Sequence, residues 1–358
     1  MAQARHEPVR LGIVGCGYAA TDRHLPALRR VPEVEVVALA DVDAAALQSA
    51  AERWGVTRRY ATTEELVADG DVEAVAVCIP AAAHAEATIA ALEAGKHVLV
   101  EKPLTRTLTE ADAVLTAAAR ASVQATVGFN LRWHSHTRRA REALADGWLG
   151  APHALHSSFT DQALARPGLP EWRRRRELGG GALIDKAIHH FDLWRVLLGD
   201  EVEEVFAQSN SERSDDETLT VTARAAGGTL ATLVASDVTA TTNAVTVFGE
   251  TGSLELDFYR ADGVAHATAA DVPGAPRTRA RRALAATKIL ARNAADLRRG
   301  GIFLASYAAQ WRAFAAAIRS GAALDCSLED GKRALQVALA AARSVRTGRP
   351  VRVAEVNE

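Results

Sequence analysis

The chain has 358 residues, of which 48% are hydrophobic and 24% charged, a globular balance with apolar material for about two domains. Its formal net charge of −2 argues against a protein that binds nucleic acid over its whole surface. Three scattered cysteines are too few for a disulfide framework, and no apolar run is long enough to cross a bilayer, so we expect a cytoplasmic protein. Arginine outnumbers lysine by 37 to 5, a bias of GC-rich coding that favours a bacterial source.

Apolar strands alternate with helices in the first part of the chain. Nearly continuous apolar runs predict strands at Arg10–Val14, Val34–Ala40, Val72–Ile79, His97–Val100 and Gln124–Gly128. The helical patterns between them are a stretch that ends at Arg30, a helix capped by Asp43 that ends at Trp54, Ala81–Ala94 and Thr109–Ala121. Strands that alternate with helices in this way indicate βαβ units, so we predict a doubly wound parallel sheet over residues 8–130.

The remaining residues, 131–358, have a different pattern. A long helix is predicted at Ala182–Leu198, directly after three glycines. Strands without intervening helices follow, at Val202–Ser209, Thr218–Arg224, Thr229–Ala235, Asn243–Phe248 and Ser253–Phe258. Two helices, Leu304–Ser320 and Leu328–Thr347, complete the pattern. Strands in direct succession indicate antiparallel pairing, so we predict an α/β domain with a large, mostly antiparallel open sheet.

The segment Pro276–Gly301 is rich in alanine and arginine. Its apolar residues Leu284, Leu290, Ala294 and Leu297 recur at helical spacing. We interpret the segment as an amphipathic helix that follows a mobile loop and packs on its own domain or on a neighbouring subunit. A nucleic-acid role is the weaker alternative, because one basic helix on a net-acidic protein is not a binding face by itself.

A glycine-rich turn of the form G-x-G-x-x-A joins the first predicted strand to the first helix, with Gly15, Gly17 and Ala20 at its three defining positions. The first glycine permits a tight turn, and the second lets backbone N–H groups approach a pyrophosphate. The small third residue allows close helix–strand packing, and the helix N-terminus supplies partial positive charge. Such a turn alone is weak evidence, but its position inside a βαβ unit favours a dinucleotide site.

Asp41 stands at the end of the second predicted strand, 24 residues beyond Gly17. A carboxylate at this position accepts hydrogen bonds from the ribose hydroxyls of NAD and repels the 2′-phosphate of NADP. No arginine follows closely, so NAD is favoured over NADP. The alternative role, a helix N-cap, fits Asp43 better.

The tripeptide Glu101-Lys102-Pro103 follows the strand predicted at His97–Val100. Ligands of open α/β sheets bind at the carboxyl ends of the strands. Pro103 can hold a tight turn that directs the lysine, which a cis peptide bond would allow. An ammonium group here can polarise a carbinol or carbonyl oxygen or shuttle its proton. Without further context, a surface lysine at a strand end is the more ordinary interpretation.

Asp185 and His189 lie four residues apart on the long helix predicted after the three glycines. A carboxylate one helical turn before a histidine can orient the ring and stabilise its protonated form, as acid–base catalysis needs. Such a pair is more often a surface salt bridge. A metal site is not expected, because no third ligand has a recognisable spacing.

Together these motifs resemble the glucose–fructose oxidoreductase, inositol dehydrogenase and rhizopine catabolism (Gfo/Idh/MocA) family. The resemblance runs from about residue 8 to the last helix and is carried by GIVGCGYAATDRHLPAL, AGKHVLVEKPL, GFNLRW and GGGALIDKAIHHFD. It implies an N-terminal Rossmann domain over 8–130 and a substrate and oligomerisation domain over 131–358, whose last helix could pack back towards the first. Family members often oligomerise through the open sheet, so a homodimer or homotetramer is expected. The family's catalytic lysine matches Lys102, and its Asp/His pair matches Asp185 and His189. Ala187 departs from a glycine common in relatives.

The resemblance adds residues with weaker support. Tyr18 and Ala19 are expected to flank the cofactor, as are Glu101 and the segment of Pro80 and His84; a structural role for His84 is equally consistent with the sequence. Arg132, Trp172 and Arg173 match positions near the nicotinamide or the substrate. Trp172 could equally belong to the core, and the arginine run from Arg173 could be a solvated loop.

The resulting hypothesis is an NAD-dependent dehydrogenase or ketoreductase that acts on a sugar, an inositol or a related cyclic alcohol. One alternative is an NAD-dependent glycosidase that oxidises a hydroxyl transiently and eliminates the aglycone. Another is a catalytically silent NAD(H)-binding regulator, against which the intact Lys102, Asp185 and His189 count.

Overall fold

The computed structural model describes residues 7–272, 274–298 and 301–357, and the chain divides into two compact units. Unit 1 contains the chain up to Asn130 together with Tyr307–Lys332. Unit 2 contains Leu131–Ser306 together with Arg333–Asn357. The sequence analysis placed one domain boundary between residues 130 and 131 and assigned all later residues to the second domain. In the structure the first segment of unit 1 ends at Asn130, and Tyr307–Lys332 also belongs to unit 1.

Buried polar contacts explain why Tyr307–Lys332 belongs to unit 1. The indole Nε1 of Trp311 donates a hydrogen bond of 3.1 Å to Nδ1 of the buried His24. The hydroxyl of Thr126 donates to the carbonyl of Cys326 at 2.8 Å. A sequence pattern shows that a helix has a buried face but not which domain covers it. The resemblance suggested a return to the first domain only for the last helix, and not for the helix before it.

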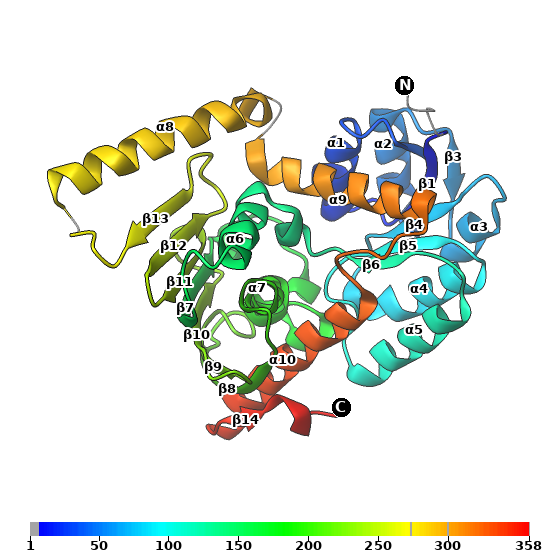
Figure 1. Cartoon of the computed structure of the whole chain (residues 1–358). Helices are drawn as coiled ribbons and strands as arrows, with labels where there is room; N and C mark the ends of the chain where they lie inside the picture. The colour runs from blue at the N-terminus through cyan, green and yellow to red at the C-terminus, as the bar shows by residue number, and fades with distance from the viewer. Residues whose placement is uncertain (1–6, 273, 299–300, 358) are drawn as a thin grey trace. The chain divides into compact units, whose positions relative to one another are not determined.

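The described part of unit 1 forms a six-stranded parallel sheet in the order β3-β2-β1-β4-β5-β6, which confirms the doubly wound prediction. Its strands are β1 Val9–Val14, β2 Val34–Ala40, β3 Arg58–Tyr60, β4 Ala74–Val77, β5 His97–Val100 and β6 Ala125–Val127. The helices are α1 Leu25–Leu28, α2 Ala44–Trp54, α3 Thr63–Ala68, α4 His84–Glu93 and α5 Leu108–Arg120. Helices α3, α4 and α5 lie together on one side of the sheet (Figure 1).

The sequence analysis missed β3 and α3. Strand β3 has three residues at the edge of the sheet, and none of them is fully buried, so it lacks the apolar run that reveals β1 and β2. The predicted N-cap of α2 is confirmed: the Asp43 side chain accepts hydrogen bonds from the backbone N–H groups of Ala45 and Ala46.

The described part of unit 2 forms an eight-stranded sheet in the order β13-β12-β11-β7-β10-β9-β8-β14. Its strands are β7 Pro152–Thr160, β8 Val202–Asn210, β9 Thr218–Ala225, β10 Leu230–Ser236, β11 Thr242–Gly249, β12 Gly252–Asp257, β13 Val264–Thr268 and β14 Val351–Arg352. All neighbouring strands are antiparallel except β7 and β10, which confirms the mostly antiparallel open sheet. The central β7 and the helix α6, Ser135–Ala145, were missed because their sequences are rich in His, Ser and Arg.

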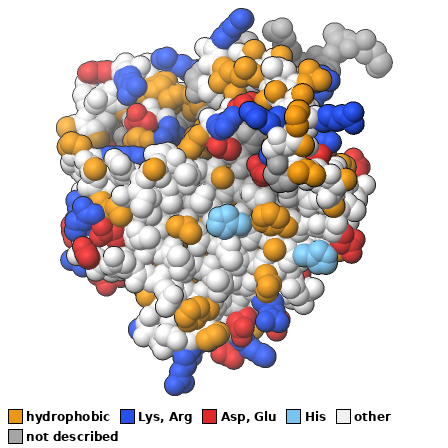
Figure 2. Space-filling view, turned by 90° about the vertical axis from the view of Figure 1, so that its left-hand side faces the viewer, with side chains coloured by type: hydrophobic (Ala, Val, Ile, Leu, Met, Phe, Trp, Pro, Cys, Tyr) orange, Lys and Arg blue, Asp and Glu red, His pale blue; other side chains and the backbone are white. Residues whose placement is uncertain are grey.

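The two faces of this sheet differ in character. Alternate residues of β9, β10 and β11 are buried on the inner face, which packs against α7, Ile188–Leu198. There Trp194 of α7 donates a hydrogen bond of 3.0 Å to the hydroxyl of Ser157 in β7. The outer face, shown in Figure 2, has Thr220, Thr222, Thr232 and His156 exposed, with charged side chains gathered mainly at its margins.

Three long helices follow the sheet: α8 Pro276–Arg298, α9 Gly301–Ser320 and α10 Leu328–Thr347. The prediction of a helix at α8 is confirmed, and α8 contacts β13. The predicted apolar face does not pack on its own domain, because Leu284, Leu290 and Leu297 are exposed in the single chain. Packing of this face on a neighbouring subunit stays a prediction. The face of α8 that is covered contains Thr278 and Asn293, whose amide donates to the carbonyl of Ala261. A hydrogen bond to a loop carbonyl therefore helps to decide which face packs.

Candidate active site

The glycine turn of unit 1 contains Gly15 and Gly17, and the space available for a side chain differs between the two positions. Gly15 has φ +94°, and a Cβ there would lie 2.5 Å from the carbonyl oxygen of Cys78, so the fold itself excludes a side chain. A Cβ on Gly17 would meet no protein atom within 4 Å. The protein's own packing does not require Gly17, so its lack of a side chain leaves open space where a pyrophosphate would approach. Ala20 is buried, as close helix packing requires.

Asp41 lies at the end of β2 beside this turn. One carboxylate oxygen accepts the N–H of Cys16 at 2.6 Å, and the other accepts the N–H of Asp43 at 2.8 Å. The carboxylate is therefore held in place while each oxygen keeps further lone pairs for ribose hydroxyls. Burial, followed by the charge of Asp41, raises the pKa of the Cys16 thiol to about 12, so this cysteine is unreactive at neutral pH.

Large apolar side chains are exposed next to the turn. Tyr18 is 52% exposed and Val42, the neighbour of Asp41, is 91% exposed. Ala19 is half-buried, and Pro80, after β4, is exposed. Because the strands of unit 1 are parallel, the residues that follow β1, β2, β4 and β5 all lie at the carboxyl edge of the sheet. These features fit an adenine dinucleotide.

The Glu101-Lys102-Pro103 segment follows β5 at the same edge. Lys102 is half-buried, and its peptide bond to Pro103 is cis. The Glu101 carboxyl is buried; one oxygen lies 2.8 Å from Nε2 of His24, and the other accepts the N–H of Lys102 at 3.1 Å. Glu101 therefore faces the protein interior through these contacts.

His84, expected to line the cofactor site, is fully buried at the start of α4. Its Nδ1 lies 2.7 Å from the carbonyl oxygen of Pro103, and its Nε2 lies 2.8 Å from that of Ile79. Burial lowers the pKa of His84 despite these acceptors. The ring joins the loop after β4 to the loop that carries Lys102.

In unit 2, the segment of Asp185 and His189 is not a continuous α-helix as predicted. Residues Leu183–Ala187 form a π-helical turn that leads into α7. Asp185 forms an ion pair with Arg173, and His189 is buried with its ring 6.1 Å from that of Phe159. The Arg173 guanidinium also lies 6.0 Å from the ring of the half-buried Trp172. The ion pair thus brings the Trp172-Arg173 pair and Asp185, which were selected from different motifs of the sequence, together.

A buried arginine and a buried lysine form ion pairs at α7 and at the π-helical turn that leads into it. Arg132, expected near the substrate, forms a bidentate pair with Asp192 of α7. Its Nε donates to Oδ2 at 2.7 Å and its Nη2 donates to Oδ1 at 2.5 Å. Lys186, which the sequence analysis did not select, is buried between Asp161 at 3.1 Å and Asp237. Burial lowers the pKa of Lys186. The scarcity of lysine, already evident in the sequence, was the signal that could have singled it out.

His190, next to His189, has a separate environment. It is fully buried, and its Nε2 lies 3.1 Å from the amide oxygen of Asn243 in β11. Burial lowers its pKa to about 4. The ring is therefore neutral at physiological pH and connects α7 to the sheet.

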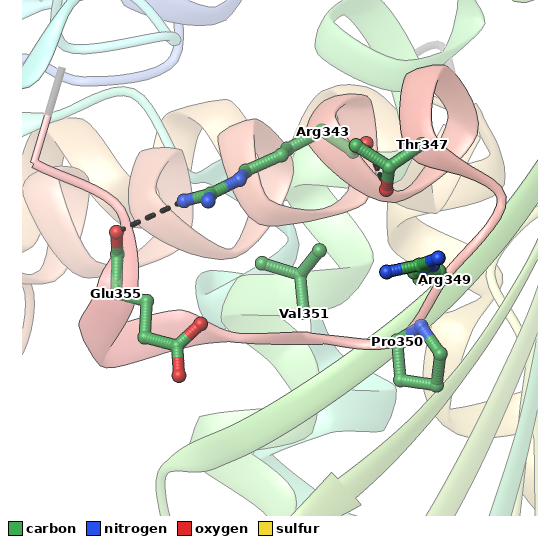
Figure 3. A pocket seen from close by; sticks show the side chains of 6 residues that line it. All are labelled: Arg343, Thr347, Arg349, Pro350, Val351 and Glu355. Carbon is green, nitrogen blue, oxygen red and sulfur yellow. Dashed lines mark hydrogen bonds between the residues drawn. The ribbon is translucent and has the colours of Figure 1, made fainter.

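A surface pocket of about 420 Å³ lies between the end of α10 and β14 (Figure 3). Its lining residues are Arg343, Thr347, Arg349, Pro350, Val351 and Glu355, and Arg343 donates to the carbonyl of Glu355. None of the predicted site residues lines it, so we do not assign it to the cofactor. Among the described residues, no group of His, Cys, Asp and Glu side chains is arranged to hold a metal ion. No helix in the described ranges is both long and apolar enough to cross a membrane.

Comparison with known proteins agrees with this geometry. Residues 9–129 match the model described as "Oxidoreductase family, NAD-binding Rossmann fold", and residues 137–255 match the "GFO/IDH/MocA C-terminal domain". The chain belongs to the Gfo/Idh/MocA oxidoreductase family. It is 31% identical to myo-inositol 2-dehydrogenase of Thermotoga maritima, over 97% of this chain and 99% of that one.

Other known proteins are similar over shorter lengths or in fold. A 1,5-anhydro-D-fructose reductase of Ensifer adhaerens is 36% identical over 56% of this chain and 60% of its own. The WlbA dehydrogenase of Bordetella pertussis, solved with NADH and UDP-GlcNAcA, covers 98% of this chain and 99% of its own with a TM-score of 0.81; at 21% identity, this similarity shows the fold. The protein is therefore an NAD-binding Rossmann oxidoreductase of a family that acts on sugars and inositols.

The two glycines make a matched pair of variants. Gly15→Ala should lower the free energy of unfolding by about 1–3 kcal/mol, because of the positive φ and the nearby Cys78 carbonyl. Gly17→Ala should leave stability unchanged and weaken NADH binding by about tenfold or more. Thermal unfolding and titration of NADH fluorescence measure the two effects. Tight NADH binding by a stable Gly17→Ala variant would contradict the assignment of the turn.

Proposed function

We propose that this protein transfers a hydride between nicotinamide and a ring carbon of a sugar, an inositol or a related cyclic alcohol. The observation that carries the proposal is the shared carboxyl edge of the unit 1 sheet, where Gly17, Asp41 and Lys102 follow β1, β2 and β5. The substrate class is supported by the names of its relatives, which include an inositol dehydrogenase and a sugar reductase.

In the proposed reaction, bound NAD supplies the hydride acceptor or donor. Lys102 polarises the reacting oxygen, and His189 accepts or returns the proton of the hydroxyl. Asp185 orients His189, and the Arg173 partner holds Asp185 in turn. Arg132, Trp172 and Arg173 are proposed to border the substrate.

The proposal is tested by following NADH absorbance with a panel of inositols, sugars, nucleotide sugars and their ketones. Stoichiometric NADH consumption with a ketone would exclude an NAD-dependent glycosidase, which regenerates its cofactor in each cycle. Tight NADH binding without turnover of any panel member would favour a silent regulator instead.

The cofactor preference should depend on Asp41. We expect NAD to bind at least about tenfold more tightly than NADP, because the fixed carboxylate repels a 2′-phosphate. Asp41→Asn, which keeps an oxygen acceptor for the Cys16 N–H, should reduce the preference. Isothermal titration with both cofactors measures it, and equal affinities in the wild type would refute the assignment.

Catalysis should require Lys102 and His189 together. Replacing either by Ala should lower kcat by about 10²–10⁴-fold with NAD binding nearly intact. Asp185→Asn should cost less, because it weakens the orientation of the base without removing it. Alcohol oxidation should rise with pH as His189 loses its proton, and ketone reduction should favour the protonated ring. If both Ala variants keep more than about a tenth of wild-type kcat in steady-state assays, the roles are wrong.

We also propose a cytoplasmic homodimer or homotetramer that associates through the outer face of the unit 2 sheet. This face exposes Thr220, Thr222, Thr232 and Leu230, side chains that can be covered without burying a charge. Thr232→Glu should lower the mass measured by light scattering after gel filtration. Thr116→Glu, on the exposed side of α5, is the matched control. An unchanged oligomer in Thr232→Glu would contradict the proposed interface.

A further inference from the structure

Two buried histidines of unit 1 contact the loop that carries Lys102. His24 lies at the end of the π-helical turn Ala20–His24, and His84 lies at the start of α4. Both are fully buried, so neither side chain can be a solvent-facing ligand group without a change of conformation. Their contacts lie on opposite sides of Lys102 in the chain, at Glu101 and at Pro103.

His24 acts on the residue before Lys102. Its Nε2 lies 2.8 Å from one oxygen of Glu101, and the other Glu101 oxygen accepts the backbone N–H of Lys102 at 3.1 Å. Behind Glu101, a Cβ on Gly128 would lie 2.9 Å from the carboxyl, so the end of β6 leaves just enough room for it. The carboxyl is thus confined between the His24 ring and the backbone of β6.

The contact between His24 and Glu101 is a hydrogen bond donated by His24, whether the His24 ring is charged or neutral. Desolvation lowers the pKa of His24, but Cys78 and Glu101 raise it, to about 10. The indole N–H of Trp311 can only donate, and at 3.1 Å from Nδ1 it favours a lone pair there. A charged ring and a neutral ring with Nδ1 as acceptor both carry a proton on Nε2. His24 therefore donates to Glu101 in both cases.

His84 acts on the residue after Lys102. Its Nδ1 faces the Pro103 carbonyl at 2.7 Å and its Nε2 faces the Ile79 carbonyl at 2.8 Å. Since burial lowers its pKa, the ring is neutral near pH 7 and has one proton to donate. The contact with Pro103 is the more buried of the two.

We propose that His24 and His84 are positioning residues for Lys102, which hold the backbone before it through Glu101 and after it through the Pro103 carbonyl. The proposal rests on the catalytic role proposed for Lys102. A lysine ammonium ends a flexible four-carbon stem, so its placement depends on how firmly the backbone is held. A displacement of about 1 Å at a reacting group can cost about 10²-fold in rate.

The test follows Lys102 directly and needs no substrate. The chain has only five lysines, so protein labelled with ¹³C at lysine Cε gives a spectrum in which Lys102→Ala identifies the Lys102 signal. With NADH bound, His24→Leu should shift or broaden that signal beyond its linewidth, and His24→Gln, which keeps an N–H near the Nε2 position, should restore it. His97→Asn is the matched control, because His97 at the start of β5 accepts only the Gln124 N–H in the described contacts.

The amide variants of His84 separate its two contacts. His84→Asn keeps a donor near Nδ1, towards Pro103, and His84→Gln keeps one near Nε2, towards Ile79. We expect the Lys102 signal to stay near its wild-type position in His84→Asn and to move in His84→Gln. If His24→Leu does not fold, His24→Asn, whose shorter side chain places its amide near Nδ1 and not near Nε2, is compared with His24→Gln instead, and a displaced Lys102 signal is expected only for His24→Asn.

An unchanged Lys102 signal in both His24→Leu and His84→Gln, or equal changes in His84→Asn and His84→Gln, would overturn the proposal. Kinetics distinguish this failure from that of the proposed function. Where Lys102→Ala retains kcat but His24→Leu displaces the signal, the positioning stands and the catalytic role fails. Where Lys102→Ala abolishes turnover, His24→Leu should lower kcat by about 10–100-fold and leave KM within a few-fold of wild type.

Discussion

The parallel pairing of β1 with β2 on one side and with β4 on the other is the constraint on which the site in unit 1 depends. Because the strands run in one direction, the residues after their carboxyl ends gather at one edge of the sheet. At the middle of that edge the Gly15 backbone lies so close to the Cys78 carbonyl that no side chain fits. A change in this register would move the glycine turn relative to both Asp41 and Lys102.

Polar contacts, rather than apolar packing alone, set the positions of the functional side chains. In unit 1, Asp41 is held by two backbone N–H groups and Glu101 by His24 and the N–H of Lys102. In unit 2, Asp185, Asp192 and Lys186 are each held by a partner of opposite charge. Buried charges persist only when paired, so these pairs restrict both the conformation and the substitutions that each site tolerates.

Regular periodicity made most of the fold predictable, and its absence explains the errors. Strands such as Val34–Ala40 and His97–Val100 are largely apolar runs, and they match the prediction residue for residue. The central strand β7 was missed because its sequence, PHALHSSFT, carries histidines and serines where an apolar alternation would identify a strand. In α8 an apolar stripe was present, but within the single chain another face packs.

The sequence by itself determined the two fold classes, the glycine turn with its acidic partner Asp41 and the membership of a family. Each of these depends on periodicity or on motifs whose order and spacing can be seen along the chain. Only the tertiary structure decided that His24 and His84 contact the Lys102 loop, that Arg132 pairs with Asp192 and that Tyr307–Lys332 belongs to unit 1. These contacts join residues between 19 and 287 positions apart, and their partners are selected by burial and hydrogen bonding in three dimensions, which no periodicity in the chain encodes.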